Sequence, residues 1–282
     1  MRLTIRDLKE MKRHGEKIAM LTAYDYTSAK IIEDAGVRLV LVGDSLGQVV
    51  LGYDSTVPVT MDEMVHHIRA VVRGTKSSHI VGDMPFLSYQ TDHTDAIRNA
   101  GRLLKEGGAQ SVKLEGGRRV ADTVRRVVEA GIPVMGHIGL TPQSVNQLGG
   151  YRVQGRTSRT AEELIEDARA LEEAGAYSVV LELVPAALAS MITEHLSIPT
   201  IGIGAGVHCD GQVQVFHDLM GLFTDFAPKH ARRYANLAET IKAAAAEYIS
   251  DVQGQSFPSD KESFDMKESV LAELAGQPSG PA

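Results

Sequence analysis

The sequence predicts an α/β protein built as a (β/α)8 TIM barrel, with a short helix before the barrel and a mobile tail after it. Between residues 17 and 221, short β-branched apolar runs alternate about eight times with amphipathic stretches, which is the pattern of βα units. Several runs are apolar throughout, as in strands buried on both faces of a parallel sheet. This repetition favours a closed barrel, and an open doubly wound sheet is the alternative.

Each expected strand is a short run rich in Val, Ile and Leu that ends near a glycine or a polar residue. The strands are predicted over residues 18–23, 39–43, 79–83, 111–114, 133–137, 177–183, 200–203 and 212–216. Apolar residues at helical spacing predict helices between them, over 28–35, 61–73, 94–106, 120–130 and 161–174. Glycines such as Gly131 and Gly175 follow these helical patterns, where they can form C-caps.

The two ends of the chain differ from the repeating part. The first 16 residues predict a short amphipathic helix that covers the bottom of the barrel, with Leu8 and Met11 facing inward. The catalytic domain is expected over residues 1–250. Residues 251–282 are polar and rich in Ser, Gly and Pro, so we expect a disordered tail with a short helix near residues 266–274.

Composition excludes several classes of function. The net charge of -7 argues against a surface that neutralises nucleic acid or an anionic membrane. No apolar run approaches the roughly 18 residues that a bilayer crossing needs. Cys209 is the one cysteine, so no intramolecular disulfide forms, and no signal-peptide pattern opens the sequence. These features predict a cytoplasmic protein.

Four acidic residues end apolar runs, where catalytic groups of a barrel are found. They are Asp44 in LVLVGDS, Asp83 in HIVGDMP, Glu115 in SVKLEGG and Glu182 in SVVLELVP. One such acid is more often a helix cap or a solvated loop residue. Four such acids at the same end of a barrel repel each other unless they share a cation or a proton. Their oxygen atoms suit a hard cation, so the sequence predicts a Mg²⁺ site.

Further candidates surround these acids. Lys113 lies two residues before Glu115, so both side chains point into the barrel, where Lys113 meets either a substrate oxygen or one of the acids. His137, in PVMGHIGLTPQ, is either a site residue or a satisfied core residue. The run IGIGAG at residues 201–206 lacks the dinucleotide pattern, which leaves an anion-binding ring of N–H groups or a tight packed turn. Cys209 needs an activating base to act as a nucleophile.

A series of longer motifs resembles one enzyme family. The chain is similar to ketopantoate hydroxymethyltransferases over about residues 2–250, in motif order and spacing. The motifs are TAYDYTSA, LVGDSLGQVVLGYDSTVPVTMDEM, VGDMPF, VKLEGG, GHIGLTPQ, YRVQGR, LELVP, IGIGAG with CDGQVQVFHD, and FAPKHARRYANL.

The resemblance implies a (β/α)8 barrel that transfers a one-carbon unit from 5,10-methylenetetrahydrofolate to 3-methyl-2-oxobutanoate. The product is 2-dehydropantoate, on the route to pantothenate, and the family assembles as a homodecamer. The implied magnesium-associated acids are Asp44, Asp83 and Glu115. The implied keto-acid contacts are Asp44, Ser45, Asp83 and Lys113, and Glu182 is the implied proton acceptor.

Two other classes of function compete with this one. A related magnesium barrel that acts as an aldolase or C–C lyase on another 2-keto acid keeps the strand-end acids but needs no folate. A non-catalytic binding or scaffold protein tolerates substitution of Glu182 and shows no turnover.

Overall fold

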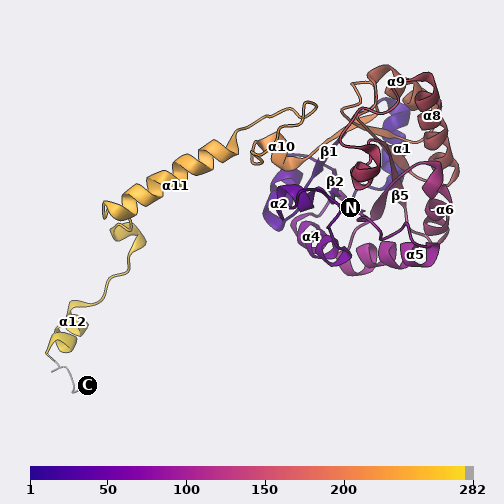
Figure 1. Ribbon diagram of the computed structural model, residues 1–282. Coiled ribbons are helices and arrows are strands. Elements are labelled where there is room, and N and C mark those ends of the chain that lie inside the picture. The colour runs from indigo at the N-terminus through magenta and orange to yellow at the C-terminus, as the bar shows by residue number, and fades with distance from the viewer. Residues whose placement is uncertain (277–282) are drawn as a thin grey trace. The chain divides into compact units, whose positions relative to one another are not determined.

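The eight strands close into a parallel barrel in chain order in the computed structural model, which describes residues 1–276 (Figure 1). The strands are β1 (Ile18–Thr22), β2 (Leu39–Val42), β3 (His79–Asp83), β4 (Ser111–Glu115), β5 (Val134–Gly139), β6 (Ser178–Glu182), β7 (Thr200–Ile203) and β8 (Gly211–Gln214). Closure comes from β1 and β8, which pair in parallel with Met20 opposite Val213. The predicted TIM barrel is confirmed, and the open-sheet alternative is wrong.

Helices cover the outside of the barrel, as Figure 1 shows. The longer ones are α2 (Tyr26–Asp34), α4 (Met61–Gly74), α5 (His93–Arg102), α6 (Ala121–Glu129), α8 (Ser158–Glu173) and α9 (Ala186–His195). The start of α4 illustrates the local cause: the backbone N–H of Thr60 donates to Glu63 at 2.7 Å, and Thr60 caps the helix in return. A π-helical turn (Leu103–Gly107) continues α5.

Strand alternation divides the core into two layers. Leu39 and Leu41 of β2 point into the barrel and pack in one cluster with residues of other strands, such as Met135. Val40 and Val42 point outward into a larger cluster that includes residues of the surrounding helices. Both faces of the strand are therefore buried, which explains why the strand sequences are apolar throughout.

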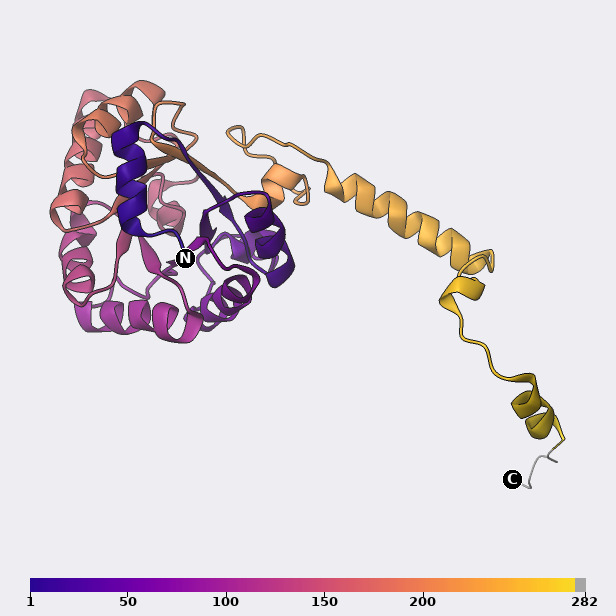
Figure 2. The same cartoon turned by 180° about the vertical axis from the view of Figure 1, so that it is seen from behind.

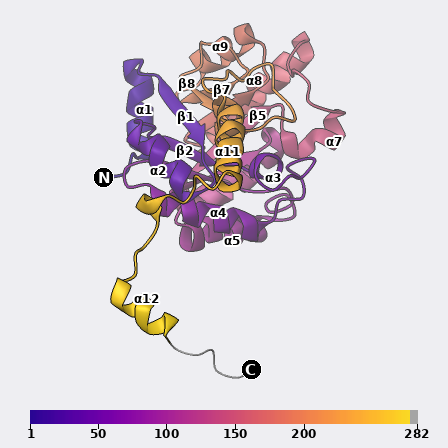
Figure 3. The same ribbon diagram turned by 90° about the vertical axis from the view of Figure 1, so that its left-hand side faces the viewer.

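The helix α1 (Ile5–His14) closes the N-terminal end of the barrel. It lies over the barrel end that faces the viewer in Figure 2. Leu8 is buried in the interior cluster and Met11 packs against it, as predicted. Lys12 Nζ lies 2.8 Å from Asp210 Oδ2, just before β8. Figure 3 shows the short helices α3 (Leu46–Val49) and α7 (Val145–Leu148) away from α1, because they follow the C-terminal ends of β2 and β5.

The chain divides into two compact units, at a place that differs from the predicted residue 250. The first unit ends at Tyr234 and the second begins at Ala235. The reason is α11 (Leu237–Gln253), which crosses the predicted boundary; the shift toward Ser, Gly and Pro begins only after this helix. The predicted short helix corresponds to α12 (Glu268–Ala275), and residues 277–282 of the predicted tail lie outside the described residues.

Within residues 1–276, no helix combines the length with the apolar character that a bilayer span requires.

Candidate active site

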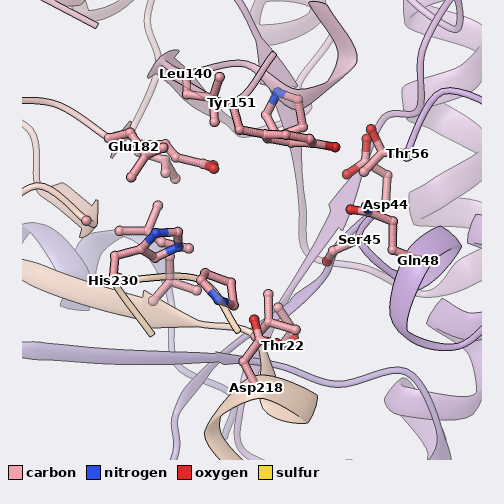
Figure 4. Close-up of a pocket in the computed structure, with 18 of the residues that line it drawn as sticks. Thr22, Asp44, Ser45, Gln48, Thr56, Leu140, Tyr151, Glu182, Asp218 and His230 are labelled. Carbon is pink, nitrogen blue, oxygen red and sulfur yellow. The ribbon is translucent and has the colours of Figure 1, made fainter. Parts of the chain in front are cut away.

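The four strand-end acids line the same cavity, which has a volume of about 810 Å³ and also contains Lys113. Asp44 and Glu182 are labelled among its lining residues in Figure 4. Asp44 follows β2, while Asp83, Glu115 and Glu182 are the last residues of β3, β4 and β6. Asp44, Asp83 and Glu115 are 5% exposed or less, and the Glu182 side chain is 14% exposed. The structure therefore brings the predicted acids together, three of them out of bulk water.

Lys113 is paired within this acidic group. Its Nζ lies 2.8 Å from Asp83 Oδ1 and 3.9 Å from Glu115 Oε1. Burial disfavours its charge, but the negative charges of Asp83 and Glu115 outweigh burial and raise its pKa. Lys113 therefore stays protonated, and since it also lines the cavity, it presents a positive charge there.

Asp44 has the most unfavourable electrostatic surroundings of the three buried acids. Burial, followed by repulsion from Asp83 and Glu115, raises its pKa well above the usual value. Its backbone N–H donates to Asp83 Oδ2 at 3.1 Å, which places the two carboxylates close together. Ser45, the next residue, also lines the cavity, and its hydroxyl lies 2.8 Å from the Tyr24 hydroxyl.

These acids have the donor chemistry of a site for a hard divalent cation. The four strand-end carboxylates face two cationic side chains, Lys113 and His137, which leaves excess negative charge that a divalent cation would neutralise. Among residues 1–276, no three His, Cys, Asp or Glu side chains already form a preassembled metal site. Mg²⁺ usually takes only one or two protein carboxylates and completes its shell with water and substrate oxygens. The donor set therefore fits Mg²⁺.

Gln143 fixes two of the acids, although it was not among the residues predicted from the sequence. Its side-chain amide donates to Asp44 Oδ2 at 2.9 Å, and its backbone N–H donates to Glu115 Oε2 at 3.0 Å. The Tyr89 hydroxyl donates to Gln143 Oε1 at 2.8 Å, which orients the amide. Gln143 lies in the motif GHIGLTPQ, which was a usable signal, whereas no sequence signal marked Tyr89.

His137 connects Glu115 and Glu182. Its Nδ1 lies 3.4 Å from Glu115 Oε1 and its Nε2 lies 3.1 Å from Glu182 Oε2. Burial and Lys113 disfavour the imidazolium, but the two glutamates outweigh them and raise its pKa to about 9. Hydrogen bonding from His137, against the effect of burial, lowers the pKa of Glu115. His137 is therefore a residue of the site and forms an ion pair with Glu182.

Two other sequence candidates have structural explanations. A Cβ atom at Gly204 of IGIGAG would lie 2.7 Å from a methyl group of Leu183 and 3.0 Å from Cβ of His230. This crowding favours the packed turn over an anion-binding ring. Cys209 is 1% exposed, is not among the residues lining the cavity, and has a pKa raised by burial, so it lacks the features of a nucleophile.

Comparison with known proteins gives the family. The model of the ketopantoate hydroxymethyltransferase family matches residues 2–260. The chain belongs to this family. A 3-methyl-2-oxobutanoate hydroxymethyltransferase from Carboxydothermus hydrogenoformans is 61% identical over 97% of this chain and 99% of its own. One from Chloroflexus aurantiacus is 59% identical over 98% of both chains.

Solved structures with much lower identity share the fold of this hydroxymethyltransferase family member. A phosphoenolpyruvate phosphomutase from Streptomyces platensis superposes with a TM-score of 0.60 at 14% identity, over 97% of this chain and 96% of that one. At this identity the likeness concerns the barrel alone. The chain is thus a transferase on a barrel that is also used for other reactions.

Proposed function

We propose that the chain adds a hydroxymethyl group from 5,10-methylenetetrahydrofolate to 3-methyl-2-oxobutanoate, forming 2-dehydropantoate for pantothenate synthesis. The name shared by the relatives supports the transfer. The observation that carries the chemistry is a cavity that contains buried Asp44, Asp83 and Lys113 together with the more accessible Glu182. This arrangement provides charge balance for a 2-keto acid beside a group able to accept its proton.

We assign the metal-binding role to Asp44, Asp83 and Glu115. When bound, Mg²⁺ would act as a Lewis acid that withdraws charge from the keto acid. A cation bound by these three acids would also offset the mutual repulsion that raises the pKa of Asp44, which makes the burial of all three carboxylates less unfavourable. Asp44, Ser45, Asp83 and Lys113 then contact the keto acid.

Glu182 accepts the proton from C3 of the keto acid. His137, 3.1 Å from Glu182 Oε2, orients that carboxylate, while the charge of Lys113 balances the anionic substrate. The C3 carbanion then forms a bond to the methylene carbon of the folate as the bond from that carbon to N10 breaks. Water attacks the same carbon and the bond to N5 breaks, which leaves the hydroxyl group on the product. Tetrahydrofolate leaves with one nitrogen protonated by the proton that Glu182 took from C3 and the other by a proton from water.

We also propose that the protein acts in the cytoplasm as a homo-oligomer, a decamer as the family resemblance implies. Support for assembly comes from α11, which has no buried side chain in the single chain. Its apolar residues recur at helical spacing, as at Ile241, Tyr248 and Val252, and each of these is exposed. An apolar stripe of this kind is normally covered by another surface.

A turnover assay tests the proposal. Purified protein is given 3-methyl-2-oxobutanoate and 5,10-methylenetetrahydrofolate with and without Mg²⁺, and 2-dehydropantoate is measured. We expect product only with both substrates and a strong loss after chelation. Glu182→Gln is the inactive control. Turnover of a 2-keto acid without folate would instead identify a lyase or aldolase, and no turnover would favour a binding protein.

A further inference from the structure

The cavity extends beyond the acids and is larger than the keto acid needs. Its volume of about 810 Å³ lies in the range of pockets for drug-sized ligands, roughly 300–1,000 Å³. Away from the acids, its lining is mainly apolar and includes Leu183, Phe223, Phe226 and Pro228. The proposed function requires a second, larger substrate in the same cavity, and this apolar part provides the space.

One carboxylate stands apart from the strand-end acids. Asp218 belongs to the short helix α10 (Phe216–Met220), which follows β8. The backbone N–H of Phe216 donates to Thr22 Oγ1 at 2.9 Å, so α10 is held against the end of β1. Asp218 lines the cavity, and Figure 4 places it beside Thr22, away from Tyr151 and Leu140.

Within residues 1–276, the Asp218 carboxylate accepts no hydrogen bond and forms no salt bridge. Arg233 influences it through its positive charge without pairing with it. Burial raises the pKa of Asp218, against the opposing effect of Arg233. A partly buried carboxylate that faces a cavity without donors from the protein is satisfied by water or by a ligand that brings donors of its own.

The segment after α10 forms the adjacent part of the wall. Its backbone is tied down by hydrogen bonds from Tyr234 N–H to Leu219 O at 2.8 Å and from Arg232 N–H to Gln214 Oε1 at 2.7 Å. Phe223 and Phe226 of this segment line the cavity, and Phe226 is 65% exposed. An exposed aromatic ring at a cavity wall is suited to cover the flat face of a ligand ring.

We propose that Asp218 binds the pterin ring of the folate substrate, with Phe223 and Phe226 against the ring system. This inference rests on the proposed function. A reduced pterin presents two adjacent donors, N3–H and the 2-amino group, which match the two oxygens of a carboxylate. The keto acid offers only acceptors and a negative charge, so Asp218 repels it. Asp218 therefore separates the two substrates within one cavity.

The test compares Asp218→Asn with Asp225→Asn, a matched change at an exposed residue of the same segment that does not line the cavity. Calorimetry measures binding of tetrahydrofolate in the presence of Mg²⁺ and 3-methyl-2-oxobutanoate. Losing a charge-assisted pair should weaken tetrahydrofolate binding about 10- to 100-fold in Asp218→Asn. The KM for 5,10-methylenetetrahydrofolate should rise similarly, while the KM for the keto acid and the behaviour of Asp225→Asn stay at wild-type values.

A change in the ligand distinguishes loss of the Asp218 contact from a folding defect in the variant. A 2-desamino-2-methyl analogue of tetrahydrofolate lacks one of the two donors, so the wild type should bind it more weakly than tetrahydrofolate. Asp218→Asn should discriminate less between the two ligands. Equal tetrahydrofolate affinity in Asp218→Asn and the wild type would overturn the Asp218 assignment and leave the transfer reaction intact. Failure of the wild type to bind tetrahydrofolate or to turn over would instead reject the proposed function.

Discussion

Two glutamates at equivalent strand ends have different surroundings. Glu115 is 5% exposed and accepts a hydrogen bond from the Gln143 backbone, which fixes its direction. The Glu182 side chain is 14% exposed and has His137 as its close ionic partner. A fixed, buried carboxylate suits a metal ligand, whereas a more accessible one suits proton transfer. Substitutions at the two positions should therefore fail in different ways.

We expect Glu182→Gln to bind the keto acid and Mg²⁺ but to exchange the C3 hydrogen with deuterated water at least about 100-fold more slowly, because the amide cannot accept a proton. Glu115→Gln should instead need more Mg²⁺ for the same exchange rate. NMR follows the C3 signal in the absence of folate, which isolates proton removal from transfer. A wild-type exchange rate in Glu182→Gln would show that a group other than Glu182 removes the proton.

Glu33, which does not line the cavity, has a carboxylate with a strongly lowered pKa. Its carboxylate accepts backbone hydrogen bonds from Lys76, Ser77 and Ser78 at 2.7–2.8 Å. Burial alone would raise its pKa, but these bonds outweigh burial and lower the pKa to about 2. Since the folded pKa is depressed, the stabilisation is complete above the unfolded pKa of about 4.3 and is lost as pH falls toward 2.

Glu33→Gln should lower the free energy of unfolding by about 1–2 kcal/mol at pH 7, because the charged acceptor is lost. The difference from wild type should shrink between about pH 5 and pH 2. Urea unfolding at several pH values measures it. Glu16→Gln, at an exposed position, is the control and should show no such pH dependence. A difference that is constant with pH would remove the carboxylate charge from the explanation.

At the scale of elements, the join between β5 and β6 determines where Glu182 sits. Gly139 ends β5 with a φ of +92°, and a Cβ atom there would collide with the carbonyl oxygen of Glu182. That same oxygen accepts a hydrogen bond from Leu140 N–H at 2.8 Å. The missing side chain at Gly139 therefore lets the two strand ends come together and fixes the backbone that carries Glu182.

Gly139→Ala should destabilise the protein by more than Gly131→Ala and should also slow C3 exchange. Gly131 has a similar φ of +86° but has open space around its Cα, so its substitution reports the backbone strain alone, about 1–2 kcal/mol. Thermal unfolding and the NMR exchange assay measure the two effects. If both variants lose the same stability and retain wild-type exchange, the close approach of Gly139 to the Glu182 backbone does not affect proton removal.

The elements also show what was predictable from sequence. The strands and the acids that end them are predictable from local apolar runs. The barrel fold then places the C-terminal ends of all strands on the same face, so these acids lie together. Gln143 and Asp218 lie on loops and short helices whose path depends on tertiary packing, and spacing along the chain does not determine which strand end they reach. The partner of Lys113 likewise required geometry, since period-2 alternation gave its direction but could not choose Asp83 over a substrate.

At the scale of the whole molecule, the chain divides into two compact units, the first of which ends at Tyr234. Composition predicted a tail that starts at residue 251, but composition reports where the chain becomes Gly- and Ser-rich, not where one compact unit ends and the next begins. The helix α11 precedes that change and still belongs to the second unit, which begins at Ala235. A boundary set by contacts rather than by composition could not be obtained from sequence alone.

Two truncations separate α11 from the segment after it. Ending the chain after Gln253 should leave the number of chains in the assembly, the activity and the stability nearly unchanged, because the described residues beyond it are exposed. Ending it after Tyr234 also removes exposed Ile241, Tyr248 and Val252, and should reduce the mass of the assembly. Light scattering measures that mass. An unchanged mass after the shorter truncation would show that α11 takes no part in assembly.

The closure of the barrel bottom by α1 has a kinetic consequence. With one end covered, ligands enter from the end where the strand acids and the Phe226 segment lie. Under the proposed function, the keto acid occupies the strand ends, and the folate fills the apolar part beside the later loops. If the bound folate covers the strand ends, we expect the keto acid to bind first and the folate second, and tetrahydrofolate to leave before the product acid.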